Sequence, residues 1–96
     1  MAIEVRDIRA FEGPNLYYPQ TGVKLTIWAD RDIGRQISDT LKTWAQMTGV
    51  VIGYLRQQSE PDQDGMLITT TWTTPLPTVG AQIAHQIAAD LAAAEG

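Results

Sequence analysis

The sequence contains no cysteine, one histidine and only two serines. Without cysteine, disulfide frameworks, cysteine-ligated zinc, iron–sulfur clusters and thiol catalysis are excluded. The single histidine, His85, has no second histidine with which to bind a metal. Ser38 falls inside a predicted helix and Ser59 in a polar run, so neither has the sharp strand-to-helix turn of a serine nucleophile. Metal sites and covalent catalysis therefore lack their usual residues.

Positive charge and long apolar runs are also scarce. The seven Lys and Arg residues are scattered among eleven Asp and Glu residues, which gives a net charge of −4. An acidic chain without a basic run does not attract nucleic acid or anionic membranes. The most apolar segment, 79–94, is interrupted by polar residues and is shorter than the ~20 apolar residues that span a membrane. No basic-then-apolar leader opens the sequence, so we predict a cytoplasmic protein without nucleic-acid or membrane partners.

Alternation of apolar and polar residues predicts four strands, at 3–11, 23–28, 50–55 and 66–74. The phase of the first strand changes near Arg6-Asp7, where a β-bulge would return its apolar residues to one face. The run 57–65 is the most polar of the chain and is predicted to be a loop. The third and fourth strands would then form a hairpin with a long tip.

Two amphipathic helices are predicted between and after these strands. The first is N-capped by Asp30 or Asp32 and runs to about Met47, with Gly49 as its stop. The second begins near Val79, after two prolines. Their expected buried stripes are Ile33, Ile37, Leu41 and Trp44 in the first, and Val79, Ile83, Ile87 and Leu91 in the second. The order β-β-α-β-β-α predicts one α+β domain over residues 1–96, a two-layer sandwich with two helices on one face of a four-stranded sheet.

Motifs for bound cofactors are missing. The sequence has no Gly-x-x-x-x-Gly-Lys-Ser/Thr or Gly-x-Gly-x-x-Gly run, so no nucleotide or other cofactor is predicted. The run 62–65 lacks the later glutamate of a calcium loop. His85 falls away from the buried stripe of its helix and is expected to face solvent or a partner. Since no cluster of titratable residues is evident, we predict a non-catalytic chain, and a small enzyme is the weakest interpretation.

The most specific stretch joins the first two strands, where Gly13-Pro14-Asn15 forms a turn flanked by aromatic residues. Residues 8–17, followed by 23–25, resemble the opening of the N-terminal domain of cyanophycin synthetases and related Mur-ligase-family proteins. Residues 80–88 are similar to the closing helix of that domain, which has a Gly-x-x-x-x-His pattern. Where those enzymes have glutamates beside the histidine, this chain has Ala84 and Ala89.

The resemblance implies a domain that precedes an ATP-dependent amide ligase and has no ATP site of its own. It would be a non-catalytic N-terminal domain, or a free-standing relative, that positions a peptide-like or polymer substrate or docks on the catalytic domains in cis or in trans. Its binding residues would be Gly13, Pro14, Asn15, Tyr17 and His85. For the turn itself, a purely structural role is the alternative.

A second hypothesis is a self-associating structural module, a homo-oligomer without a ligand. It is based on the threonine-rich face of the fourth strand and on aromatic residues that would form an exposed patch, Tyr17, Tyr18 and Trp28. For Trp28 alone, the competing interpretation is a residue at the rim of the sheet that a loop covers.

Overall fold

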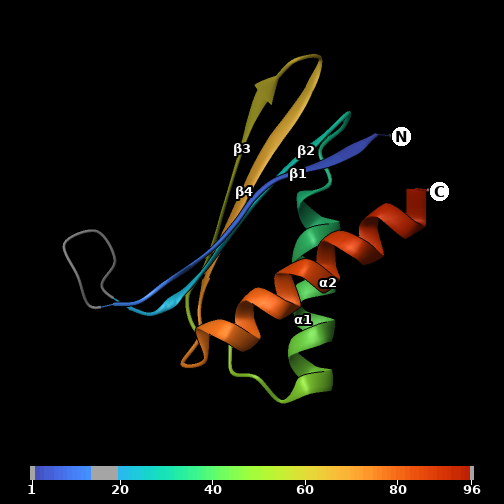
Figure 1. Cartoon of the computed structure of the whole chain (residues 1–96). Coiled ribbons are helices and arrows are strands. Elements are labelled where there is room, and N and C mark those ends of the chain that lie inside the picture. Colours follow the sequence, from blue (N-terminus) through green and yellow to red (C-terminus); the bar gives the residue numbers. More distant parts are fainter. Residues whose placement is uncertain (1, 14–19, 96) are drawn as a thin grey trace.

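Two helices pack on one face of a four-stranded antiparallel sheet whose strand order is β1-β2-β4-β3 (Figure 1). The computed structural model describes residues 2–13 and 20–95. Its elements are β1 (Ile3–Phe11), β2 (Gly22–Ala29), α1 (Gly34–Thr48), β3 (Leu55–Asp62), β4 (Gly65–Thr73) and α2 (Pro77–Glu95). The predicted order β-β-α-β-β-α and the two-layer α+β architecture are confirmed. Neither helix of the described chain is long and apolar enough to cross a membrane.

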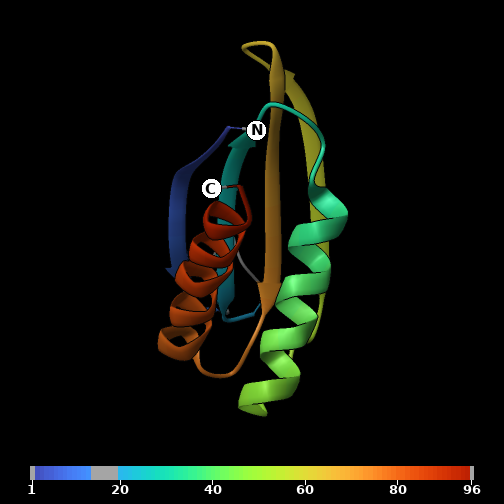
Figure 2. The ribbon, with the colours of Figure 1, turned by 90° about the vertical axis from the view of Figure 1, so that its right-hand side faces the viewer.

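The core lies between the sheet and the two helices. Figure 2 shows α2 in front of β1 and β2, and α1 in front of β4 and β3. The predicted stripes face inward, with Ile37, Leu41 and Ile87 fully buried. The alternation of β2 is confirmed as well, because Val23, Leu25 and Ile27 are fully buried and the residues between them are not.

The predicted β-bulge of β1 is present. The pairing of β1 with β2 shifts between Val5 and Asp7, so that Arg6 is the extra residue. Val5 lies opposite Ile27, and Ile8 lies opposite Leu25. Because residues directly opposite each other share a face, the bulge turns the apolar residues on both sides of it toward the helices.

The prediction for the third strand was wrong. Residues 50–54 form the connection from α1, in which Val50 and Ile52 pack against the core. The regular strand is β3, Leu55–Asp62, most of which was predicted to be a loop. The strand has polar side chains because it lies at the edge of the sheet, where backbone hydrogen bonds to β4 rather than side-chain burial hold it. Pro61 is compatible with such an edge, since its missing donor is not needed there.

The predicted long hairpin tip was also wrong. Asp62 pairs with Gly65, so only Gln63 and Asp64 form the turn between β3 and β4. Both have positive φ angles, 48° and 62°, as in a type I′ turn. The Asp-Gly dipeptide at 64–65 was the available signal for a short hairpin. In the usual Asp-Gly turn the glycine is the second central residue, whereas here Gly65 follows the two central residues.

The start of α1 differs from the prediction in detail. Ile33 is the N-cap residue, and neither Asp30 nor Asp32 takes that position. The carboxylate of Asp32 nevertheless accepts a hydrogen bond from the backbone N–H of Gly34 at 2.9 Å. The helix ends at Thr48, and Gly49 caps it with a left-handed φ of 73°, as predicted.

Candidate functional site

Among residues 2–13 and 20–95, no three His, Asp or Glu side chains gather where they could hold a metal ion. Three surfaces of the described chain are candidates for binding instead. They are the region around Gly13 and Thr21, the hollow between the helices beside His85, and the face of the sheet that the helices leave uncovered.

Gly13 and Thr21 hold the ends of the β1–β2 connection together. The Thr21 hydroxyl accepts a hydrogen bond from the backbone N–H of Gly13 at 3.2 Å, and it lies 3.3 Å from the Gly13 carbonyl, to which it donates. A Cβ on Gly13 would come within 2.5 Å of the Gln20 carbonyl carbon, so this close approach requires glycine. The other predicted binding residues of this connection, Pro14, Asn15 and Tyr17, lie outside the described residues, as does Tyr18.

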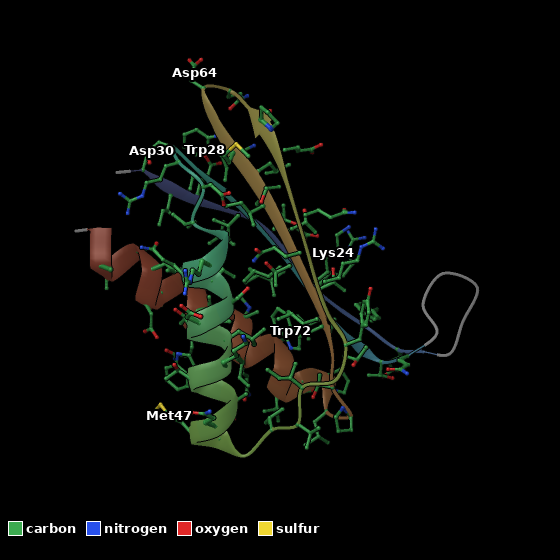
Figure 3. The ribbon with its side chains drawn as sticks, turned by 180° about the vertical axis from the view of Figure 1, so that it is seen from behind. Lys24, Trp28, Asp30, Met47, Asp64 and Trp72 are labelled. Atoms are coloured by element: carbon green, nitrogen blue, oxygen red, sulfur yellow. The ribbon has the colours of Figure 1, made fainter. Side chains whose placement is uncertain are left out.

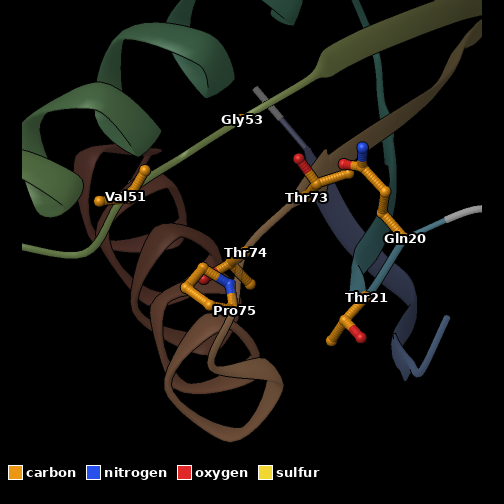
Figure 4. A pocket seen from close by; sticks show the side chains of 7 residues that line it. All are labelled: Gln20, Thr21, Val51, Gly53, Thr73, Thr74 and Pro75. Carbon is orange, nitrogen blue, oxygen red and sulfur yellow. The ribbon is translucent and has the colours of Figure 1, made fainter. Parts of the chain in front are cut away.

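A hollow of about 270 Å³ opens at the same end of the sheet (Figure 4). Its lining includes Gln20 and Thr21 from the β1–β2 connection, Val51 and Gly53 from the segment before β3, and the end of β4 with Pro75. The side chains that line it are uncharged. The Thr73 hydroxyl within it accepts a hydrogen bond from the backbone N–H of Tyr54 at 2.8 Å. This hollow therefore has little free polar chemistry.

The hollow beside His85 lies between α1 and α2 and measures about 380 Å³. Its apolar lining comes from Trp44, Val79 and Ile83, and its polar lining is Thr48, Gln82, His85 and Gln86. The Trp44 indole N–H donates to the Asp90 carboxylate at 2.7 Å and so joins the two helices. His85 is exposed on α2, as the sequence predicted. This hollow shares no lining residue with the one beside Thr21, so the structure does not join His85 and Gly13 in one site.

The third surface, which we call the open face, is the side of the sheet away from the helices. Figure 3 shows Lys24 on this side and Trp72 between the sheet and the helices. Three rows of directly paired residues cross the four strands in the order β1, β2, β4, β3. The acid row is Glu4, Trp28, Leu67 and Glu60; the middle row is Asp7, Thr26, Thr69 and Gln58; the basic row is Arg9, Lys24, Thr71 and Arg56.

Some charges of the open face are already paired within the chain, and others are not. Two ion pairs lie on β1. Oε1 of Glu4 lies 3.4 Å from Nε of Arg6, and Oδ2 of Asp7 lies 3.5 Å from Nη2 of Arg9. Lys24, Arg56 and Glu60 have no hydrogen bond or ion pair from their side chains to any other described residue. These three charges therefore remain available to a partner.

Trp28 lies in the acid row and is only partly exposed. Its indole N–H donates to the carbonyl of Asp62 at 2.7 Å, so the end of β3 covers one edge of the ring. Trp28 is therefore partly covered, as the rim interpretation expected, but by the end of strand β3 and not by a loop. The remaining ring surface belongs to the open face.

The sequence alone could not assemble the rows of the open face, because they combine residues as distant as Arg9 and Arg56. Only the strand order and register bring them together.

Neither a curated protein nor a solved structure matches this chain. Residues 2–96 match the family described as "Domain of unknown function (DUF4938)". The match covers more than half of the chain, and the chain is accordingly a member of the DUF4938 family.

Proposed function

We propose that this chain is a non-catalytic binding domain that holds a peptide-like segment beside an ATP-dependent amide ligase. The ligase association is supported by the sequence resemblance of residues 8–17 and 80–88. The observation that supports binding is the hollow between α1 and α2, in which apolar side chains lie beside two amides and an imidazole.

The chemistry of this hollow suits a peptide backbone. Each peptide unit has one donor and one acceptor, and the Gln82 and Gln86 amides also offer both. Trp44 and Ile83 supply apolar surface for a side chain, and the bond from Trp44 to Asp90 fixes the indole in place. A hollow of about 380 Å³ is at the small end of ligand sites, so it accommodates a short segment.

The same hollow lacks the parts of a reactive site. The Thr48 hydroxyl of this hollow donates to the Trp44 carbonyl at 2.7 Å, and no hydrogen bond joins it to His85 among the described residues. Among the described residues, no carboxylate bonds to His85 and orients it for proton transfer. These features favour a role in binding over a role in catalysis.

The binding part can be tested by NMR with the uniformly ¹⁵N-labelled chain and N-acetyl-trialanine-amide as the probe. We expect the Trp44 indole N–H signal and the Gln86 side-chain amide to shift, while the Trp28 indole signal stays. His85→Ala and Gln86→Ala should each weaken binding, and Gln46→Ala, an exposed amide on α1 outside the hollow, should not. Shifts that avoid the hollow, or that Gln86→Ala leaves unchanged, would contradict the proposal.

The ligase part has a separate test, which is to read the coding frame around this chain and its neighbouring genes. A Gly-x-x-x-x-Gly-Lys-Ser/Thr loop in the same frame, or an ATP-dependent amide ligase encoded next to it, would support the association. If neither is found, the ligase association fails, and the binding proposal depends on the NMR titration alone.

A further inference from the structure

We propose that two copies of this chain associate face to face through their open faces, related by a twofold axis that runs across the strands. The partner is a second copy, and the charge pattern of the sheet selects this one arrangement. The inference does not depend on the ligase association or on the hollow beside His85, which lies on the helical side of the molecule.

The open face has the composition of an interface. Apart from Lys24, its two central strands contribute uncharged side chains, among them Trp28 and Leu67, and its other charges lie on the edge strands β1 and β3. A less polar centre surrounded by a charged rim is typical of protein–protein contacts. Because both edge strands have an acidic residue in the acid row and an arginine in the basic row, the face can complement a copy of itself.

Only one of the two face-to-face twofold arrangements uses this complementarity. With the axis across the strands, each strand faces the same strand of the second copy, and the acid row faces the basic row. Glu60 then lies opposite Arg56 of the second copy, twice in the dimer. With the axis along the strands, each row meets itself, so Glu60 faces Glu4 and Arg56 faces Arg9. Like charges in direct opposition are unfavourable, which disfavours this second arrangement.

Two further features fit the same arrangement. A hollow of about 450 Å³ in the open face is bordered by Gln58, Glu60, Leu67 and Thr69, and the Arg56 side chain of the second copy arrives there. Lys24, whose side chain has no ion pair with another described residue, comes opposite the ring of Trp28, where a cation is attracted to an aromatic face.

The middle row meets itself in this arrangement. The uncharged Thr26 and Thr69 tolerate that contact, whereas the Asp7 carboxylates of the two chains approach and repel each other. The Arg9 side chain, 3.5 Å from Asp7 in the same chain, offsets part of this repulsion.

The size of the face sets the expected strength. Strands of about eight residues, rising about 3.3 Å per residue and spaced about 4.8 Å apart, give a four-stranded face of roughly 500 Å². Two such faces bury roughly 1,000 Å², which is near the lower limit of specific interfaces. We therefore expect a reversible dimer that weakens with salt, because its ion pairs are at the rim.

Sedimentation equilibrium across a concentration series tests the proposal. We expect the unaltered chain to dimerise and Arg56→Glu to raise the dissociation constant about tenfold or more, because it places two carboxylates opposite each other. The double variant Arg56→Glu with Glu60→Arg should restore dimerisation, since the exchanged charges again face each other. Arg35→Glu, the same charge change on the exposed surface of α1, is the matched control and should have little effect.

We expect the Arg56 and Glu60 variants to fold, because neither side chain has a hydrogen bond or ion pair to another described residue. In the NMR spectrum, the Trp28 indole signal should move with protein concentration while those of Trp44 and Trp72 stay. A monomer at all concentrations, or an Arg56→Glu variant that behaves like Arg35→Glu, overturns the proposal. An Arg56→Glu variant that dimerises more tightly overturns the arrangement and points to the axis along the strands.

Discussion

At the scale of single residues, Gly80 determines how closely α2 approaches the sheet. A Cβ at this position would lie 2.7 Å from Cγ2 of Val23 and 2.9 Å from Cγ2 of Thr74. Both neighbours are buried and β-branched, so they have little freedom to move. The first turn of α2 therefore depends on the absence of a side chain at residue 80.

We predict that Gly80→Ala lowers the free energy of unfolding. Overpacking costs about 1–3 kcal/mol, which exceeds the gain of at most about 1 kcal/mol from the better helix former. Urea unfolding measures the difference, with Thr78→Ala, an exposed residue of the same turn, as the control. A higher unfolding midpoint for Gly80→Ala would show that the helix can shift without cost.

Gln57 is the central polar residue beneath α1. Its side-chain amide nitrogen lies 2.9 Å from the Gly34 carbonyl oxygen, 3.1 Å from the Thr70 hydroxyl and 3.2 Å from the Ser38 hydroxyl, and its two N–H groups are shared among these three acceptors. Thr70 is fully buried, so its hydroxyl has no access to water. One edge-strand side chain thus joins β3, β4 and α1.

Gln57→Ala is expected to lower the free energy of unfolding by about 1–3 kcal/mol, since it leaves the buried Thr70 hydroxyl without a partner. Gln58→Ala provides a matched control, because Gln58 is the next residue on the same strand and faces the open side. Its effect should be within about 0.5 kcal/mol. Equal effects of the two substitutions would show that the Gln57 hydrogen bonds contribute nothing.

At the scale of elements, the β3–β4 hairpin has a turn whose residues do not suit its backbone. Gln63 and Asp64 both adopt positive φ angles, which cost a residue with a side chain about 1 kcal/mol or more. We predict that Gln63→Asn combined with Asp64→Gly raises the free energy of unfolding by about 0.5–1 kcal/mol. Thermal unfolding with the double variant measures this, and a lower midpoint would contradict a type I′ turn at these positions.

At the scale of the whole molecule, both helices and the central strands share one core. Trp72 is fully buried in this core, and its indole nitrogen has no hydrogen-bond partner in the described chain. We predict that urea unfolding followed by tryptophan fluorescence and by far-UV circular dichroism gives coincident transitions, because no element can leave the core without exposing the others. Separate midpoints would mean that the sheet and a helix unfold independently.

Much of the fold could be predicted from the sequence, because the determining patterns are local. The alternation of Val23, Leu25 and Ile27, and the spacing of Ile37 and Leu41, each lie within one element and determine its type and its buried side. The phase change near Arg6 revealed the bulge for the same reason. The exposure of His85 followed from its position relative to the stripe of its own helix.

Tertiary structure decided what depends on neighbours distant in the sequence. β3 is a strand because β4 supplies its hydrogen bonds, and these bonds do not depend on whether the side chains of residues 57–62 are polar. The hollow beside His85 exists because α1 brings Trp44 to α2, and the basic row exists because the register aligns Arg9, Lys24 and Arg56. The sequence by itself thus determined the order of the elements and the two layers, whereas the position of β3, the strand order, the register and the candidate surfaces arose only when the elements packed together.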